Sequence, residues 1–133
     1  MFPKIRRVAV LGAGVMGSGI AAHLANAGIP SLMLDIVPPS LTGGDRKKGL
    51  TDTSHAIRNR FAAKGLEGIR KSRPALLYSQ KDIGLISIGN FDDDLAKAAD
   101  CDWIVEVVTE NLDIKKALYD RIEASWKPGT IVT

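Results

Sequence analysis

Cysteine and histidine are scarce in this sequence, and their scarcity limits the chemistry that the chain can perform. The 133 residues include one cysteine, Cys101, and two histidines. A lone cysteine cannot form an internal disulfide, which suits a reducing compartment. Asp100 and Asp102 flank this cysteine and disfavour a reactive thiolate, so we expect Cys101 to be structural. No cluster of histidines and cysteines has the spacing of metal ligands, and we predict no metal site.

Long apolar runs are also missing. No run approaches the roughly 20 residues that a membrane-spanning helix needs, so we expect no membrane association. The first expected strand begins within a few residues of Met1, which leaves no room for a targeting peptide, and we therefore expect a cytoplasmic protein. The hydrophobic share of 45% and the charged share of 25% are ordinary for a globular protein. A chain of this length corresponds to one domain.

Aromatic residues make up only 5% of the sequence, and the most basic segment has just one of them. Residues 46–73 carry nine lysines and arginines against Asp52 and Glu67, although the formal net charge of the whole chain is +3. Such a segment predicts an anionic partner. Its one aromatic residue, Phe61, falls at a helical core position, so no stacking platform for bases is evident and we expect no nucleic-acid binding.

The most informative feature of the sequence is a set of spaced glycines between a short apolar run and a helical pattern. The stretch RRVAVLGAGVMGSGIAAHLANAG contains a short apolar run, Val8–Leu11, typical of a buried parallel strand. Gly12, Gly14 and Gly17 follow at the spacing G-x-G-x-x-G, and apolar residues then recur at helical spacing until Gly28. Strand, tight turn and helix in this order are the context that a dinucleotide site requires.

The chemistry of that site follows from the geometry. Gly12 permits a turn that is strained for other residues, Gly14 lets the backbone approach a pyrophosphate, and Gly17 lets the helix pack on the strand. A second apolar run, SLMLD, ends in Asp35. Its carboxylate can accept hydrogen bonds from both hydroxyl groups of the adenosine ribose. Asp35 would also repel a 2′-phosphate, so we predict NAD rather than NADP. A glycine-rich turn that only packs the fold is the alternative. The predicted cofactor residues here are Gly12, Ala13, Gly14, Val15, Met16, Gly17 and Asp35.

Further alternation of strands and helices predicts an α/β fold, a doubly wound parallel sheet of the Rossmann type. The expected elements are strands at 85–89, 102–108 and 130–133 and helices at 91–100 and 110–126. The acidic run at 92–94 could suggest a metal, but carboxylates that open a helix favour its positive end and cap it. We therefore expect these carboxylates to be structural.

Between the second and third strands lies a connection of about 45 residues, too long for an ordinary loop. We predict that residues 38–80 form a basic helical arm projecting from the nucleotide fold. Caps at 51, 52 and 54 would start one helix, which Gly65 would end or bend. A second helix over 66–71 would stop near Pro74.

The last expected strand would leave a sheet edge uncovered and one half of the fold incomplete. We expect residues 1–133 to be a partial dinucleotide-binding domain, a fragment of a longer polypeptide. The exposed edge should promote self-association, and we expect a homo-oligomer.

Two blocks of this sequence resemble a known family. VAVLGAGVMGSGIAAHLANAG with Asp35, and DWIVEVVTENLDIKKALYDRIEASWKPGTIVT, are similar to the NAD-binding domain of the 3-hydroxyacyl-CoA dehydrogenases of fatty-acid β-oxidation. Glu110-Asn111-Leu112 followed by Lys115 looks like the family's signature after the fourth strand. The long connection looks like that of the larger bacterial members, which are fused to further β-oxidation modules.

The resemblance implies oxidation of a 3-hydroxyacyl-CoA to the 3-ketoacyl-CoA, with hydride passing to NAD. It places Glu110 and Lys115 near the nicotinamide ribose and carboxamide, and it makes Lys64 a contact for the coenzyme A of an acyl-CoA substrate. It also implies that residues 1–133 are a partial NAD-binding domain from which the catalytic remainder and a C-terminal helical domain are absent, so that the family's catalytic histidine and its glutamate partner fall beyond residue 133. We therefore predict no catalytic residue in this chain and no turnover by the chain alone.

Simpler interpretations remain for the charged residues of the predicted site. Glu110 could be a charge at a helix N-terminus, and Lys115 and Lys64 could be solvated lysines. Two other functions also remain. One is a different NAD-dependent hydroxyacid dehydrogenase, and the other is a non-enzymatic NAD-sensing module that binds nucleic acid.

Overall fold

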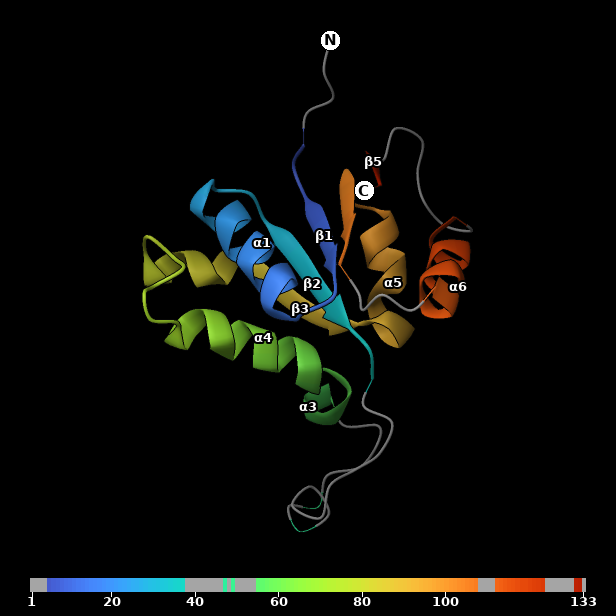
Figure 1. Ribbon diagram of the computed structural model, residues 1–133, viewed down its shortest axis with the longest axis horizontal. Coiled ribbons are helices and arrows are strands. Elements are labelled where there is room, and N and C mark those ends of the chain that lie inside the picture. The colour runs from blue at the N-terminus through green and yellow to red at the C-terminus, as the bar shows by residue number, and fades with distance from the viewer. Residues whose placement is uncertain are drawn as a thin grey trace.

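The computed structural model describes residues 5–37, 47, 49, 55–107, 112–123 and 131–132. A five-stranded sheet lies between two layers of helices (Figure 1). Its strands are β1 (Val8–Leu11), β2 (Ser31–Asp35), β3 (Ile86–Asn90), β4 (Trp103–Glu106) and β5 (Ile131–Val132). They run parallel in the order β3-β2-β1-β4-β5, which confirms the predicted doubly wound sheet.

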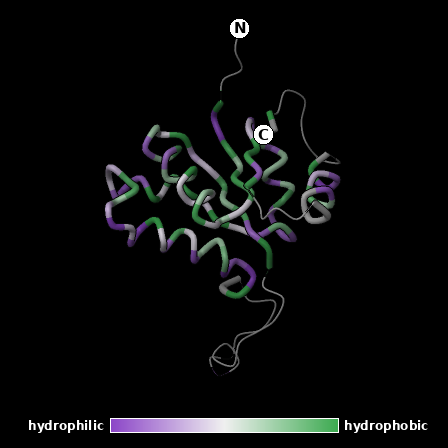
Figure 2. The backbone as a smooth tube through the Cα atoms, in the orientation of Figure 1, coloured by the Kyte–Doolittle hydropathy of each residue, from purple (hydrophilic) through white to green (hydrophobic). Residues whose placement is uncertain are grey.

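The described helices are α1 (Val15–Asn26), α3 (His55–Arg58), α4 (Arg60–Lys71), the 3-10 helix η1 (Gln80–Leu85), α5 (Phe91–Ala99) and α6 (Leu112–Glu123). α1 and α4 cover one face of the sheet, and α5 and α6 cover the other (Figure 1). Hydrophobic residues follow the central strands, whereas hydrophilic ones gather on the outer turns of the helices (Figure 2).

The two faces of the sheet have separate apolar cores. Val8 and Val10 pack toward α1 and α4, whereas Ala9 and Leu11 pack toward α5 and α6. All four residues are fully buried, because side chains alternate between the faces of a strand that is covered on both sides. Burial of both faces explains why this strand reads as an unbroken apolar run.

The helix α4, in the described part of the connection between β2 and β3, does not project from the fold as the sequence predicts. α4 lies against α1 and against β2 and β3, and it buries Ala62 and Ile69 in the same core as Val10. The expectation of an arm is therefore wrong for α4, which is the crossover helix of a βαβ unit. The predicted caps at 51, 52 and 54 lie outside the described residues.

Gly65 lies inside a helix and does not end one. α4 continues through it to Lys71, and the break between helices falls at Asn59. A Cβ atom at position 65 would lie 2.6 Å from the carbonyl oxygen of Ala13 and 2.9 Å from Oγ of Ser18. Glycine is therefore needed here because α4 approaches the glycine turn too closely for a side chain.

Gly65→Ala tests this close approach. Alanine normally stabilises a helix interior by about 1 kcal/mol relative to glycine. Here α4 would have to move away from the turn, and we expect the free energy of unfolding to fall by about 1–3 kcal/mol. Gly68→Ala is the matched control, because nothing lies within 4 Å of its Cβ position; it should raise that free energy by up to about 1 kcal/mol. Denaturant unfolding followed by circular dichroism measures both variants, and a stabilised Gly65→Ala protein would contradict the packing role.

Candidate dinucleotide site

The glycine turn connects the end of β1 to the start of α1. Gly12 has a φ of +119°, a conformation that strains residues with a side chain. Its N–H donates to the carbonyl oxygen of Leu34 at 2.7 Å, which ties the turn to β2. A Cβ atom at Gly17 would lie 1.8 Å from the carbonyl oxygen of Gly12. The predicted roles of Gly12 in the turn and of Gly17 in close helix packing are both confirmed.

The N-terminus of α1 faces open space. Gly14 is the N-cap residue and has no side chain to cap the helix, and nothing lies within 4 Å of its Cβ position. The first turn contains no acidic residue, so its unpaired N–H groups and positive dipole end favour an anion. Val15 and Met16 are 93% and 72% exposed, and a ligand lying on the turn would cover this apolar surface.

Asp35 closes β2 beside the turn. Its Oδ2 accepts a hydrogen bond from the N–H of Ala13 at 2.8 Å, and its Oδ1 accepts one from the N–H of Ile36 at 2.7 Å. The N–H of Ala13 is thus already bonded to Asp35 and does not face a phosphate. Each carboxylate oxygen keeps a further lone pair, so the fixed carboxylate can still accept hydrogen bonds from the hydroxyl groups of a ribose.

A pocket of about 640 Å³ extends from the turn to α4, within the size range of small-ligand sites. Its lining includes Gly14, Val15 and Asp35 on one side and Phe61, Lys64 and Gly68 on the other. Sequence reasoning missed that α4 forms this wall. Two glycines inside one helix, at 65 and 68, were the available signal, because a glycine within a helix often has a packing or functional reason.

Lys64 is exposed at the pocket, as a ligand contact must be. Elsewhere on α4, Glu67 forms ion pairs with Arg70 at 3.1 Å and with Lys71 at 3.5 Å. Within the described part of the chain, no such ion pair is found for Lys64. Its ammonium group can therefore pair with an anionic ligand.

The second predicted cluster is placed only in part. Glu110 lies outside the described residues, and Lys115 lies on α6, where the position of its side chain is not described. The carboxyl end of β4 does reach the turn, because the N–H of Val107 donates to the carbonyl oxygen of Leu11 at 2.9 Å. Val107 also lies 3.2 Å from the Cβ position of Gly17. The segment after β4 therefore starts beside the turn, and the roles of Glu110 and Lys115 stay predictions.

The remaining candidates of the sequence lie away from the pocket. His23 is exposed in the last turn of α1, at the helix end opposite the glycine turn. Cys101 is fully buried, in agreement with a structural role. Within the described residues, no group of three or more histidine, cysteine or acidic residues could hold a metal ion. None of the helices described there is long and apolar enough to span a membrane.

The order of strands reverses between β1 and β4, and ligands of open parallel sheets bind at such a switch point. The glycine turn lies there, and Asp35 stands beside it. Sheet, turn and carboxylate together define a dinucleotide-binding domain of the Rossmann class. The chain belongs to the family described as 3-hydroxyacyl-CoA dehydrogenase, NAD binding domain, whose model matches residues 7–133. The cofactor of this family is NAD, in agreement with the prediction.

Individual proteins similar to this chain carry names that match this family. A protein of Bacillus subtilis (strain 168), named as a probable 3-hydroxyacyl-CoA dehydrogenase, is 50% identical over 133 residues, which are 100% of this chain and 17% of that protein. One of the same name from Deinococcus radiodurans is 42% identical over 130 residues, 98% of this chain and 34% of that protein. The crystal structure of 3-hydroxybutyryl-CoA dehydrogenase from Escherichia coli K12 matches with a TM-score of 0.69 over 98% of this chain and 24% of that chain. At 21% identity, this last match bears on the fold alone.

Asp35→Ala tests the cofactor site. The variant loses a charged acceptor for the ribose hydroxyls, and we expect NAD binding to weaken roughly 10- to 100-fold. The preference for NAD over NADP should shrink, because the charge that repels the 2′-phosphate is gone. Calorimetric titration of both cofactors measures this, with Asp120→Ala, an exposed carboxylate on α6, as the control. Unchanged NAD affinity in Asp35→Ala would refute the assignment.

Proposed function

We propose that this chain is the part of a 3-hydroxyacyl-CoA dehydrogenase that binds NAD, in an enzyme of fatty-acid β-oxidation. The enzyme oxidises a 3-hydroxyacyl-CoA to the 3-ketoacyl-CoA. The observation that carries the proposal is the bond between Asp35 and the N–H of Ala13, which fixes a carboxylate at the glycine turn. Membership of the dehydrogenase family supplies the class of reaction.

When bound, NAD would supply the acceptor for the hydride of the carbinol carbon, and a base would take the hydroxyl proton. The described residues contribute binding and orientation. The N-terminus of α1 and Gly14 hold the pyrophosphate, and Asp35 holds the adenosine ribose. We propose that Glu110 and Lys115 orient the nicotinamide end from beyond β4. The family resemblance puts the histidine that takes the proton after residue 133.

Lys64 is proposed to bind the phosphorylated end of coenzyme A. Its support is its place on the pocket wall and the absence of an ion pair for it among the described residues. A lysine is suited to phosphate as a compact point charge. Glu67, by contrast, pairs with both Arg70 and Lys71 and offsets one of their two charges, which argues against a continuous basic surface for nucleic acid.

Thermal stabilisation distinguishes the possible ligands. We expect NAD and coenzyme A each to raise the melting temperature of the chain and duplex DNA to leave it unchanged, since only a ligand of the folded state stabilises it. Lys64→Ala should weaken coenzyme A binding roughly 10-fold and leave NAD binding unaltered. Lys97→Ala, an ion-paired lysine on α5, is the control. Stabilisation by DNA but not by coenzyme A would favour a nucleic-acid-binding sensor instead.

The chain by itself should bind the cofactor without catalysing the reaction. The exposed His23 lies at the far end of α1 from the glycine turn, eight residues or about 12 Å along the helix from Val15, so it is not placed to accept the hydroxyl proton. A mixture of the 133-residue chain, NAD and 3-hydroxybutyryl-CoA should give no increase in absorbance at the NADH band above the protein-free control. Turnover that persists in a His23→Ala variant, and that scales with chain concentration, would show that a base within this chain takes the proton.

A further inference from the structure

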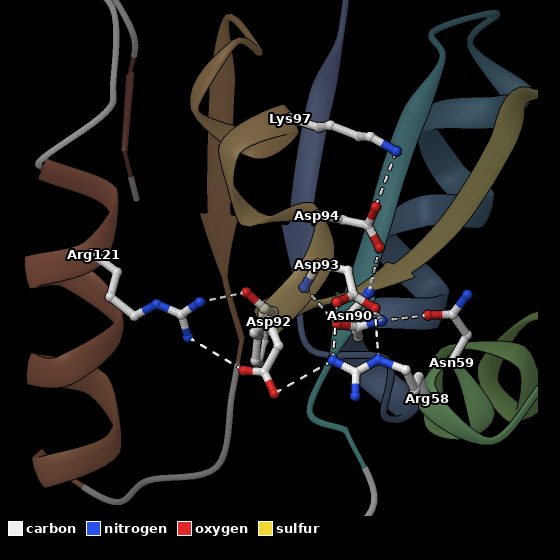
Figure 3. A network of polar contacts seen from close by, with 9 residues as sticks. Arg58, Asn59, Asn90, Asp92, Asp93, Asp94, Lys97 and Arg121 are labelled. Atoms are coloured by element: carbon white, nitrogen blue, oxygen red, sulfur yellow. Dashed lines mark hydrogen bonds and ion pairs between the residues drawn. The ribbon is translucent and has the colours of Figure 1, made fainter. Parts of the chain in front are cut away.

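A network of polar contacts ties the start of α4 to the end of β3 (Figure 3). At its centre is Asn90, which is only 1% exposed. Its Oδ1 accepts from the N–H of Asp93 at 2.8 Å, which caps α5, so the cap of that helix is Asn90 and not the acidic run we expected to supply it. Its Nδ2 donates to Oδ1 of Asn59 at 2.8 Å and to Oδ2 of Asp93 at 2.9 Å. All polar atoms of this buried side chain are thus bonded.

Asn59 lies where an asparagine side chain usually caps a helix, but its side chain does not cap α4. It is the N-cap residue of α4, yet it makes no side-chain hydrogen bond to that helix, although such a cap stabilises a helix by about 1 kcal/mol. Its side chain accepts from Asn90 instead. The usual hydrogen bond of an N-cap side chain to its own helix is therefore replaced by a bond to Asn90, which fixes the start of α4 against the end of β3.

Arg58, the last residue of α3, provides a second contact that holds the start of α4 in place. Its Nε and its terminal NH2 group donate to the two carboxylate oxygens of Asp93 at 2.7 and 2.9 Å, a forked geometry that is strong and directional. The Arg58 side chain is only 23% exposed, so solvent screens this pair less than a surface ion pair. Arg121, from α6, approaches Asp92 at 3.7 Å, and Asp92 also lies 4.0 Å from Arg58, so Arg121 meets this network only through Asp92 (Figure 3).

The fixed point lies close to the pocket. Phe61 and Lys64 follow Asn59 within the first two turns of α4, and both line the pocket. Asn90 is the register partner of Asp35 on the neighbouring strand, so the network starts at the strand position next to Asp35. Helix ends fray unless they are held, and these two pocket residues lie at such an end.

We propose that Arg58, with Asn59 and Asn90, positions the first turns of α4 so that Lys64 meets the anionic end of coenzyme A. Arg58 acts through α4 and does not itself contact the ligand. The inference rests on the proposed role of Lys64. It adds the prediction that coenzyme A affinity depends on the ion pair between Arg58 of α3 and Asp93 of α5, neither of which lines the pocket.

A double-mutant cycle on the full chain tests this inference. The dissociation constants of coenzyme A and NAD are measured by calorimetry for the wild type, Arg58→Ala, Lys64→Ala and the double variant. We expect each single change to weaken coenzyme A binding roughly 5- to 10-fold and the double change to weaken it no more than about 10-fold, because both remove one interaction. NAD binding should change less than about 3-fold, since Gly65 still holds α4 at the glycine turn.

Two further variants sharpen the test. Arg58→Lys keeps the charge but loses the fork, so its coenzyme A affinity should lie between those of the wild type and Arg58→Ala. Arg121→Ala removes an arginine that shares Asp92 with Arg58 but leaves the fork between Arg58 and Asp93 in place, and it should bind coenzyme A as the wild type does.

The outcomes separate this inference from the proposed function. If Arg58→Ala binds coenzyme A normally, if the two losses multiply to about 50-fold or more, or if NAD and coenzyme A affinities fall together, the positioning role is wrong. If Lys64→Ala binds coenzyme A as tightly as the wild type, the proposed role of Lys64 is wrong, and the inference fails with it.

Discussion

The peptide backbone of Ala13 is where the elements of the site are held together. Its N–H donates to Asp35 at the end of β2, and its carbonyl oxygen accepts from Oγ of Ser18 on α1 at 3.0 Å. Gly65 of α4 packs against the same carbonyl group. Three elements can meet at one peptide because the contacting positions are small or lack a Cβ atom. The width of the pocket, the orientation of Asp35 and the placement of α4 all depend on this meeting point.

Fixing α4 at this point gives the site two walls of different chemistry. The turn presents free N–H groups and a positive helix end, which suit a pyrophosphate. The α4 wall presents Phe61 and Lys64, an apolar surface with a cation. The network around Asn90 then determines how the second wall begins, while Gly65 determines how closely it approaches. A single crossover helix thereby links the cofactor site of the fold to the proposed contact for coenzyme A.

Local patterns of the sequence predicted much of this fold. SLMLD gave β2 with its observed bounds, and VAVL gave β1, because a strand buried on both faces is a short apolar run wherever it occurs. The third strand was expected one residue too early, since Asn90 is a polar residue at a buried strand end. Its burial depends on partners 31 and 3 residues away. No local pattern of hydrophobicity signals such a position.

The strand, the glycine turn, the first helix and Asp35 were determined by the sequence alone, because their geometry depends on neighbours within one βαβ unit. Only the tertiary structure decided what Gly65 and Asn59 do. Taken locally, a glycine within a helix indicates a break and an asparagine before a helix indicates a cap. In the fold, Gly65 permits contact with Ala13, 52 residues earlier, and Asn59 binds Asn90. Helical periodicity shows which face of α4 is apolar, but the surface that this face meets is set by the packing of the whole sheet.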